Sequence, residues 1–155
     1  MLNKCKFYLF IVVSFVVFPS VVLTGCGNDV ITDQDIKMMT VEKVSESIKD
    51  PQVILVDVRS PKKYHVGHIP GAINIHLPKI KTRMPELATA KFIIVYSGGW
   101  RDRLGSAAVK KFLKLGYQNV SELRGGIEIW KDTGRKLSVP KTSKNSESTL
   151  PEKTE

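Results

Sequence analysis

One short segment, Ser97-Gly98-Gly99-Trp100-Arg101-Asp102-Arg103, gathers residue types that could do chemistry. A serine hydroxyl becomes a nucleophile when a neighbouring base removes its proton. Backbone N–H groups at the start of a helix can hold an anion, and an arginine can clamp that anion through two hydrogen bonds. The segment therefore supports three hypotheses: a nucleophile site, an oxyanion-binding loop, or a plain connection between two elements.

The groups that would assist such chemistry are scarce. The three histidines, His65, His68 and His76, show no spacing typical of a catalytic triad, which disfavours a serine nucleophile. Both cysteines, Cys5 and Cys26, lie in the first 26 residues. The folded part therefore has no thiol of its own, no disulfide framework and no cysteine-based metal site, and we predict neither a metal nor a cofactor.

Two apolar runs predict the strands that position this segment. Val53 to Val56 is continuous and ends at Asp57, and Phe92 to Tyr96 has the same character. Such runs indicate strands buried on both faces of a parallel sheet. Since ligands of these sheets bind beyond the carboxyl ends of the strands, the loop 97–102 is the expected site.

Shorter patterns predict the remaining elements. Strands are expected at 36–39, 73–75 and 119–123, and a helix is expected from about 78 to 87. Other helices should begin after the capping residue Thr40, at Pro61 after Ser60, before the apolar stripe of Ala107, and after Gly125-Gly126. Alternating strands and helices favour an α/β domain with a parallel sheet covered on both faces.

Several motifs in this order resemble the rhodanese-like domain. They are Asp57-Val58-Arg59, the turn from Gly67 to Ala72, and Gly125-Gly126 followed by Trp130, and the similarity spans about residues 36–136. The resemblance implies a five-stranded parallel sheet with helices on both faces. It also implies that Asp57, Arg59 and His68 are structural, which agrees with the rule that buried charges persist mainly when paired.

The resemblance places Ser97 where active members carry the cysteine that accepts sulfur. A serine cannot form a persulfide, so the resemblance implies a domain without its usual nucleophile. Sulfurtransferases of the family have Cys-x4-Arg, whereas Ser97 to Arg103 is Ser-x5-Arg, similar to the longer loop of related phosphatases and arsenate reductases. Arg103 would then clamp a tetrahedral oxyanion, while Asp102 would repel it.

The two tryptophans receive different predictions. Trp130 has helical spacing from Ile127, which is typical of a core residue. Trp100 lies in a glycine-flanked loop and is expected to be partly exposed, where it either lines a pocket or partner surface or folds back over the sheet.

The first 26 residues predict export. Lys4 and Lys6 precede an apolar stretch, and Leu23-Thr24-Gly25-Cys26 resembles the bacterial lipobox, in which the cysteine is acylated after cleavage. We therefore expect a signal peptide at 1–25, a lipidated tether at 26–35, the domain at 36–136 and a disordered tail at 137–155. The alternative is an uncleaved membrane anchor.

Lipid on Cys26 would hold the protein in the bacterial cell envelope. The anchor would lie on the outer face of the cytoplasmic membrane, or on the outer membrane facing the periplasm, which Gly27 favours if two membranes are present. The formal charge is +9, and removing the charges of Lys4 and Lys6 leaves +7. We expect an anionic lipid surface rather than nucleic acid as the partner, with a merely solvated basic surface as the alternative.

Three functional hypotheses follow. The first is a non-catalytic, membrane-anchored module that binds a small oxyanion (phosphate, sulfate, thiosulfate or arsenate) or an envelope protein. The second is a sulfurtransferase- or phosphatase-related enzyme that uses Ser97 or an external thiol. The third is a purely structural envelope lipoprotein.

Overall fold

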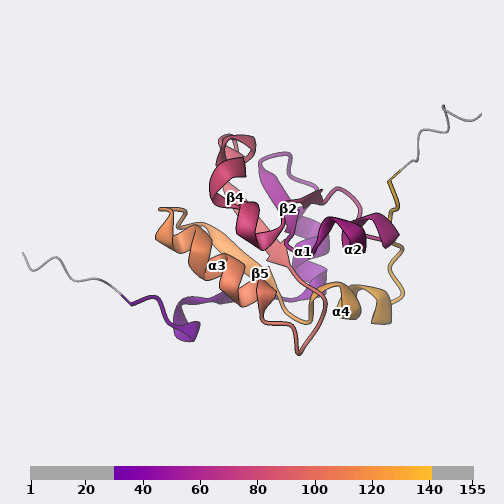
Figure 1. The fold of residues 1–155 in the computed structure, drawn as a ribbon. Helices are drawn as coiled ribbons and strands as arrows, with labels where there is room; N and C mark the ends of the chain where they lie inside the picture. The colour runs from indigo at the N-terminus through magenta and orange to yellow at the C-terminus, as the bar shows by residue number, and fades with distance from the viewer. Residues whose placement is uncertain (1–29, 141–155) are drawn as a thin grey trace, which may run out of the picture.

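A computed structural model describes residues 30–140 of the chain. The expected signal peptide, Cys26 and most of the expected tail lie outside the described residues. The core of the domain is a five-stranded parallel sheet in the order β1-β5-β4-β2-β3 (Figure 1). The strands are β1 (Lys37–Met39), β2 (Val53–Asp57), β3 (Ile73–Asn74), β4 (Phe92–Tyr96) and β5 (Val120–Leu123).

The two continuous apolar runs form the centre of the sheet. β2 and β4 are paired in register from Val53 with Phe92 to Asp57 with Tyr96. Ile93, Ile94 and Val95 are fully buried, because alternate residues of the strand face the two covered sides of the sheet. The α/β fold predicted from the sequence is therefore confirmed.

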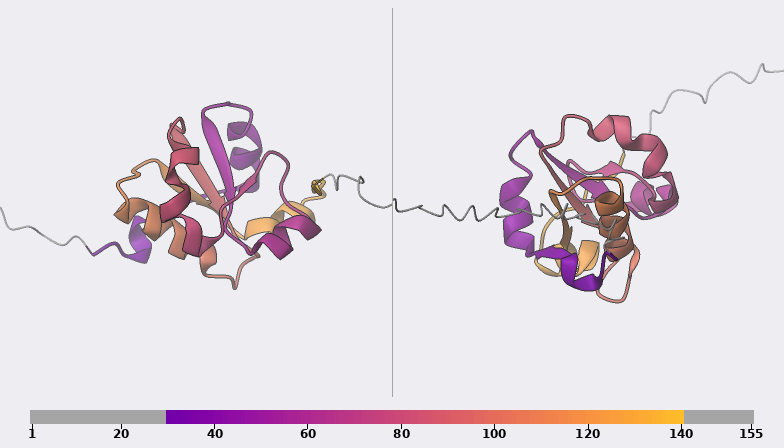
Figure 2. Two further views of the ribbon diagram at one scale, coloured as in Figure 1. Left: turned by 45° about the horizontal axis from the view of Figure 1, so that its top comes forward. Right: turned by 90° about the vertical axis from the view of Figure 1, so that its left-hand side faces the viewer.

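Helices cover both faces of the sheet (Figure 2). On one face, Ala108, Val109 and Phe112 of α3 pack with the segment between β3 and β4. On the other face, Val44 and Trp130 belong to a second buried cluster together with the turn that precedes β3. The helices are α1 (Val41–Ser47), α2 (Pro61–Val66), α3 (Leu104–Lys114) and α4 (Gly126–Asp132).

The segment between β3 and β4 differs from the predicted single helix over 78–87. It forms two 3₁₀ helices, η2 (Leu77–Lys79) and η3 (Lys81–Leu87). Pro85 lies inside η3 and has no N–H group to donate, so a regular α-helical ladder cannot form there. Ile80 and Leu87 are nevertheless buried, as the apolar positions of the pattern required.

The domain extends beyond both predicted boundaries. At its start, residues Asp33–Asp35 form a short 3₁₀ helix, η1, capped by Thr32, and Asp33 forms an ion pair with Lys110 of α3 at 2.7 Å. At its end, the N–H of Ser138 donates to the carbonyl of His68 at 2.8 Å, and the reverse bond is 2.9 Å. Residues 137–138 are thus part of the folded domain and not of a tail. Among residues 30–140, no helix has the length and apolar character needed to cross a membrane.

Candidate functional site

The loop 97–103 leaves the carboxyl end of β4 and leads into α3, as the sequence predicted. Ser97 is its most buried residue, with 1% of its surface exposed. The Ser97 hydroxyl donates to the carbonyl of Asp102 at 3.3 Å, and the Ser97 carbonyl accepts the N–H of Ile127 at 3.0 Å. In the described residues, no hydrogen bond joins Ser97 to a histidine. The serine therefore lacks the base that a nucleophile would need.

The side chain of Asp102 occupies the interior of this loop. One carboxylate oxygen accepts the N–H of Gly98 at 2.8 Å, and the other accepts the N–H of Leu104 at 2.9 Å. One of the three hypotheses from the sequence was that such N–H groups hold an external oxyanion. In the structure these two donors are already bound by a carboxylate of the chain itself.

A second carboxylate reaches the loop from α4. Glu128 accepts the N–H of Trp100 at 3.4 Å, and its side chain lies against Gly99. The sequence carries no signal for Glu128 as a site residue, because the contact joins residues 28 positions apart and depends on where α4 packs. Two carboxylates of the chain thus accept three N–H groups at this loop, those of Gly98, Trp100 and Leu104.

Two glycines bring α4 close to the loop. Gly125 and Gly126 have φ of +79° and +58°, a left-handed turn that glycine adopts without steric cost. A Cβ atom on Gly126 would meet the carbonyl oxygen of Ser97, so no larger residue fits without movement of the backbone. This close approach explains why the chain has two consecutive glycines after β5.

Trp100 forms the exposed tip of the loop, with 56% of its surface accessible. Arg124 lies over its indole ring at 5.6 Å, and the ring packs so close to Gly125 that a Cβ atom on this residue would meet it. Of the two alternatives for Trp100, the structure therefore shows an exposed ring that the neighbouring turn holds in place.

The arginines of the loop point to solvent. Arg101 and Arg103 are exposed, and so is Arg124 on the adjacent turn. None of the three takes part in an ion pair within residues 30–140. Arg103 is the N-cap residue of α3. The pKa of Asp33 is lowered mainly by the hydrogen bond from Lys110, and the charge of Arg103 adds to this effect. The clamp of an oxyanion by Arg103 stays a prediction.

The other motif residues form a buried polar network behind the loop. Asp57 is fully buried and pairs with Arg59, whose Nη2 lies 2.5 Å from Asp57 Oδ2. The same Nη2 donates to the carbonyl of Gly67 at 2.8 Å, which ties the strand end to the following turn. His68 is buried, stacks on Tyr64 at 3.9 Å between ring centroids, and is paired through its backbone with Ser138. Each of these contacts holds the architecture together.

One buried carboxyl group remains beside the start of α3. Glu122 of β5 has 6% of its surface exposed and lies against Gly105. Burial raises the pKa of this carboxyl, and the charge of Asp102 adds to the effect, whereas the hydrogen bond from Ser106 at 2.7 Å opposes it.

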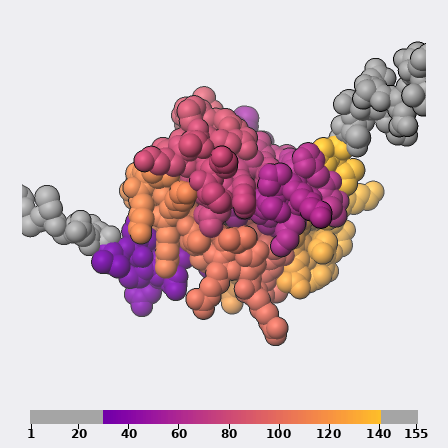
Figure 3. Space-filling model, in the orientation of Figure 1, coloured from indigo at the N-terminus to yellow at the C-terminus, as the bar shows by residue number. Residues whose placement is uncertain are grey.

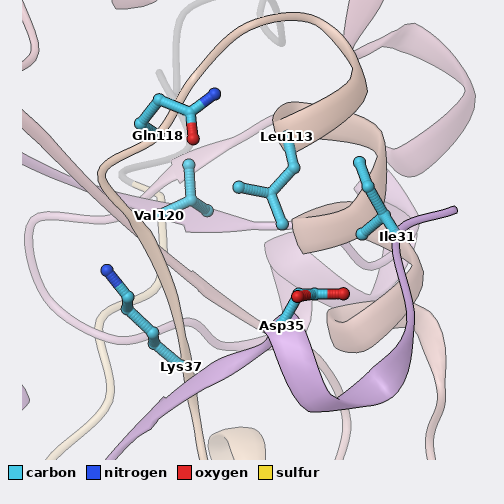
Figure 4. A pocket seen from close by; sticks show the side chains of 6 residues that line it. All are labelled: Ile31, Asp35, Lys37, Leu113, Gln118 and Val120. Atoms are coloured by element: carbon cyan, nitrogen blue, oxygen red, sulfur yellow. The ribbon is translucent and has the colours of Figure 1, made fainter. Parts of the chain in front are cut away.

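A shallow pocket lies at the opposite, amino edge of the sheet (Figure 4). Its volume is about 380 Å³, and Ile31, Leu113 and Val120 form its apolar part, with Asp35, Lys37 and Gln118 around it. It is separated from the loop by the length of α3. Within residues 30–140, no group of three histidine, cysteine or acidic side chains is placed to hold a metal ion.

The chain belongs to the rhodanese family, because the model of the rhodanese-like domain matches residues 40–133. The uncharacterized protein YqhL of Bacillus subtilis is 30% identical over 126 residues, which cover 81% of this chain and 94% of that protein. A sulfurtransferase of Allochromatium vinosum is 32% identical over 101 residues, covering 64% of this chain and 92% of that protein. This chain is therefore related to sulfurtransferases.

Larger proteins contain the same unit. A tRNA uridine(34) hydroxylase of Hamiltonella defensa is 32% identical over 105 residues, covering 63% of this chain but only 29% of that protein. Among solved structures, the protein BH2092 of Bacillus halodurans is 34% identical with a TM-score of 0.62, covering 66% of this chain and 77% of that one. The thiosulfate sulfurtransferase of Pseudomonas aeruginosa is 24% identical with a TM-score of 0.62, covering 71% of this chain and 21% of that one, and supports the fold alone.

Proposed function

We propose that this protein is a non-catalytic rhodanese-like binding module, held at the envelope membrane by lipid on Cys26. The observation that carries the proposal is the state of Ser97. This residue directly follows β4, is buried, and donates its hydroxyl to a backbone carbonyl. We place Ser97 at the position of the sulfur-accepting cysteine of active relatives.

The surroundings of Ser97 disfavour nucleophilic chemistry. A serine hydroxyl stays protonated near neutral pH unless a base activates it, and the hydroxyl here faces a carbonyl. The carboxylate of Asp102 takes the amide hydrogens of Gly98 and Leu104, which would otherwise stabilise an anion that forms in the loop. A reaction at Ser97 would have no histidine as a base and would lack the donors of Gly98 and Leu104.

The same contacts favour binding through the outside of the loop over capture of a small oxyanion inside it. An oxyanion would first have to displace the Asp102 carboxylate, which already makes two hydrogen bonds. Trp100, Arg101 and Arg103, by contrast, are exposed and available to a partner.

The membrane part of the proposal rests on the sequence before the domain. A basic start, an apolar stretch and Leu23-Thr24-Gly25-Cys26 occur in the order of a lipoprotein leader. Two or three acyl chains on Cys26 would hold the module firmly, since each buried methylene contributes about 0.8 kcal/mol.

The test is a sulfur-transfer assay on the purified protein with thiosulfate and cyanide. We expect no thiocyanate above the level of the protein-free mixture, with the thiosulfate sulfurtransferase of Pseudomonas aeruginosa as the positive control. Turnover that disappears in Ser97→Ala would overturn the proposal and favour the enzyme hypothesis. Mass spectrometry of the protein from bacterial membranes tests the anchor separately, because an unmodified Cys26 would refute it.

A further inference from the structure

The edge around Trp100 combines an exposed aromatic ring with three unpaired positive charges. Arg124 and Gly125 contact the ring of Trp100, and Glu128 accepts the backbone N–H of the same residue. These contacts fix the ring in an exposed position. Little further side-chain entropy would therefore be lost when a partner binds. We call the exposed residues Trp100, Arg101, Arg103 and Arg124 the arginine rim.

The charge of the rim selects an anionic partner. Its three arginines have no carboxylate partner within residues 30–140, although Lys49, Arg59, Arg83 and Lys110 each have one. In the space-filling view, the segment after β4 projects from the lower side of the molecule (Figure 3). The carboxylates of Asp102 and Glu128 at the same loop bind backbone N–H groups and form no ion pair with these arginines within residues 30–140.

We propose that the arginine rim docks on the anionic phospholipid surface of the membrane that carries the lipid anchor. Tryptophan rings are enriched at the headgroup level of bilayers, and basic side chains gain about 1 kcal/mol each near an anionic surface. The proposal rests on the proposed anchoring at Cys26. It adds that the folded domain has a preferred face toward the membrane.

The length of the tether makes such a weak contact effective. Val30, the first described residue, is four positions after Cys26, and these four steps span at most about 14 Å. The following η1 is fixed to α3 through Asp33 and Lys110, and α3 begins at the loop of the rim. Ile31 lies beside Leu113, at the end of α3 away from the rim, although the described N-terminus and the loop both lie on the lower side of the molecule in Figure 1. The anchored domain therefore stays at the bilayer at high effective concentration, where a few weak contacts orient it.

The two tryptophans provide the measurement. Trp130 is 5% exposed and its indole N–H is bound to the carbonyl of Lys136, so a change in fluorescence at the surface reports on Trp100. The lipidated protein is reconstituted in vesicles of phosphatidylcholine alone, or with added phosphatidylglycerol, each with brominated lipid as quencher. We expect emission to shift to the blue and to be quenched only with phosphatidylglycerol, and both effects to weaken as salt is raised. Trp100→Phe should remove both effects.

A charge-matched pair of variants tests the location. Arg101→Glu with Arg103→Glu should abolish the quenching of Trp100. Lys91→Glu with Lys114→Glu makes the same change of charge at the other edge of the sheet, before β4 and at the end of α3, and should leave it unchanged. Equal quenching on both lipids, or equal loss in both pairs, would overturn the proposal. A shift caused by added polyglutamate but not by anionic lipid would overturn it in favour of an acidic protein partner.

A further chain separates docking from anchoring. The chain from residue 26 onward with Cys26→Ser carries no acyl group, and residues 30–140 contain the whole sheet and both buried clusters needed for folding. At high lipid concentration it should still show phosphatidylglycerol-dependent quenching that Arg101→Glu with Arg103→Glu removes. If it does while natural Cys26 proves unmodified, the anchor is refuted and the docking surface stands.

Discussion

The segment from Asp57 to Asn74 and the loop 97–103 both lie at the carboxyl edge of the sheet, yet they use charge in opposite ways. In the first segment, Asp57 and Arg59 are buried and bound to each other and to the backbone. In the second, Arg101 and Arg103 are exposed and have no carboxylate partner among residues 30–140. Charge in the first segment serves the fold, and charge in the second is available for recognition.

The contacts of the loop also separate its frame from its interior. The network around Arg59 still fixes the strand ends, and Gly126 still brings α4 against Ser97. Within the loop, however, Asp102 satisfies the amides that an anion would need. The frame and the interior of the loop thus depend on different residues.

The largest effect is expected from Arg59→Ala. The variant leaves the fully buried Asp57 carboxylate without its cation, which typically costs about 3–5 kcal/mol. Arg103→Ala is the matched control and should change stability by no more than about 0.5 kcal/mol. Urea unfolding of both variants checks the comparison, and a cost for Arg103→Ala as large as that for Arg59→Ala would break it.

A smaller effect is expected from Gly126→Ala, which tests how tightly the loop is mounted. The new Cβ would meet the Ser97 carbonyl at a φ of +58°, so strain and displacement together should cost about 1–3 kcal/mol. Gly134 also has a positive φ, +74°, but open space around it. Thermal unfolding should therefore show a smaller loss for Gly134→Ala, and equal losses would mean that contact with Ser97 contributes nothing.

The sequence predicted the frame much better than the site. Continuous apolar runs such as Phe92 to Tyr96 have side chains that are buried on both faces of the sheet. Such a run is visible in the local sequence and is enough to predict a central strand. The contacts of Asp102 and Glu128 have no such signal, because they depend on where a loop and a distant helix settle. The backbone pairing of Ser138 with His68 could not be predicted either, because any residue can form such backbone hydrogen bonds.

Asp102→Ala tests whether the Asp102 carboxylate takes the place of an external anion in the loop, or only stabilises the loop. Loss of the acceptor for Gly98 and Leu104 should destabilise the protein by about 1–2 kcal/mol. At fixed ionic strength, phosphate should then raise the melting temperature of the variant more than that of the wild type, and adding Arg103→Ala should reduce this gain. An equal phosphate effect in all three proteins would reflect non-specific stabilisation. It would refute the idea that the Asp102 carboxylate fills an anion site.

The smallest effect is expected from Glu122→Gln, and its sign depends on pH. Burial raises the pKa of Glu122 in the folded protein above its ordinary value of 4.5, so the folded state favours the protonated form. Its contribution to stability is therefore fully present in acid and is lost as pH rises from 4.5 through the raised pKa. Glu122→Gln should be more stable than the wild type at pH 7, and this gain should vanish toward pH 4.5.

Glu86 provides a control of opposite sign. The hydrogen bond from Arg83 lowers the pKa of this exposed carboxyl, so its contribution is present above pH 4.5 and is lost as pH falls. Glu86→Gln should thus be slightly less stable than the wild type at neutral pH, which urea unfolding across the pH range can resolve. If both variants follow the same pH trend, the slope arises from the overall charge of the protein. Opposite pH trends would assign the slope to the burial of Glu122 beside the start of α3.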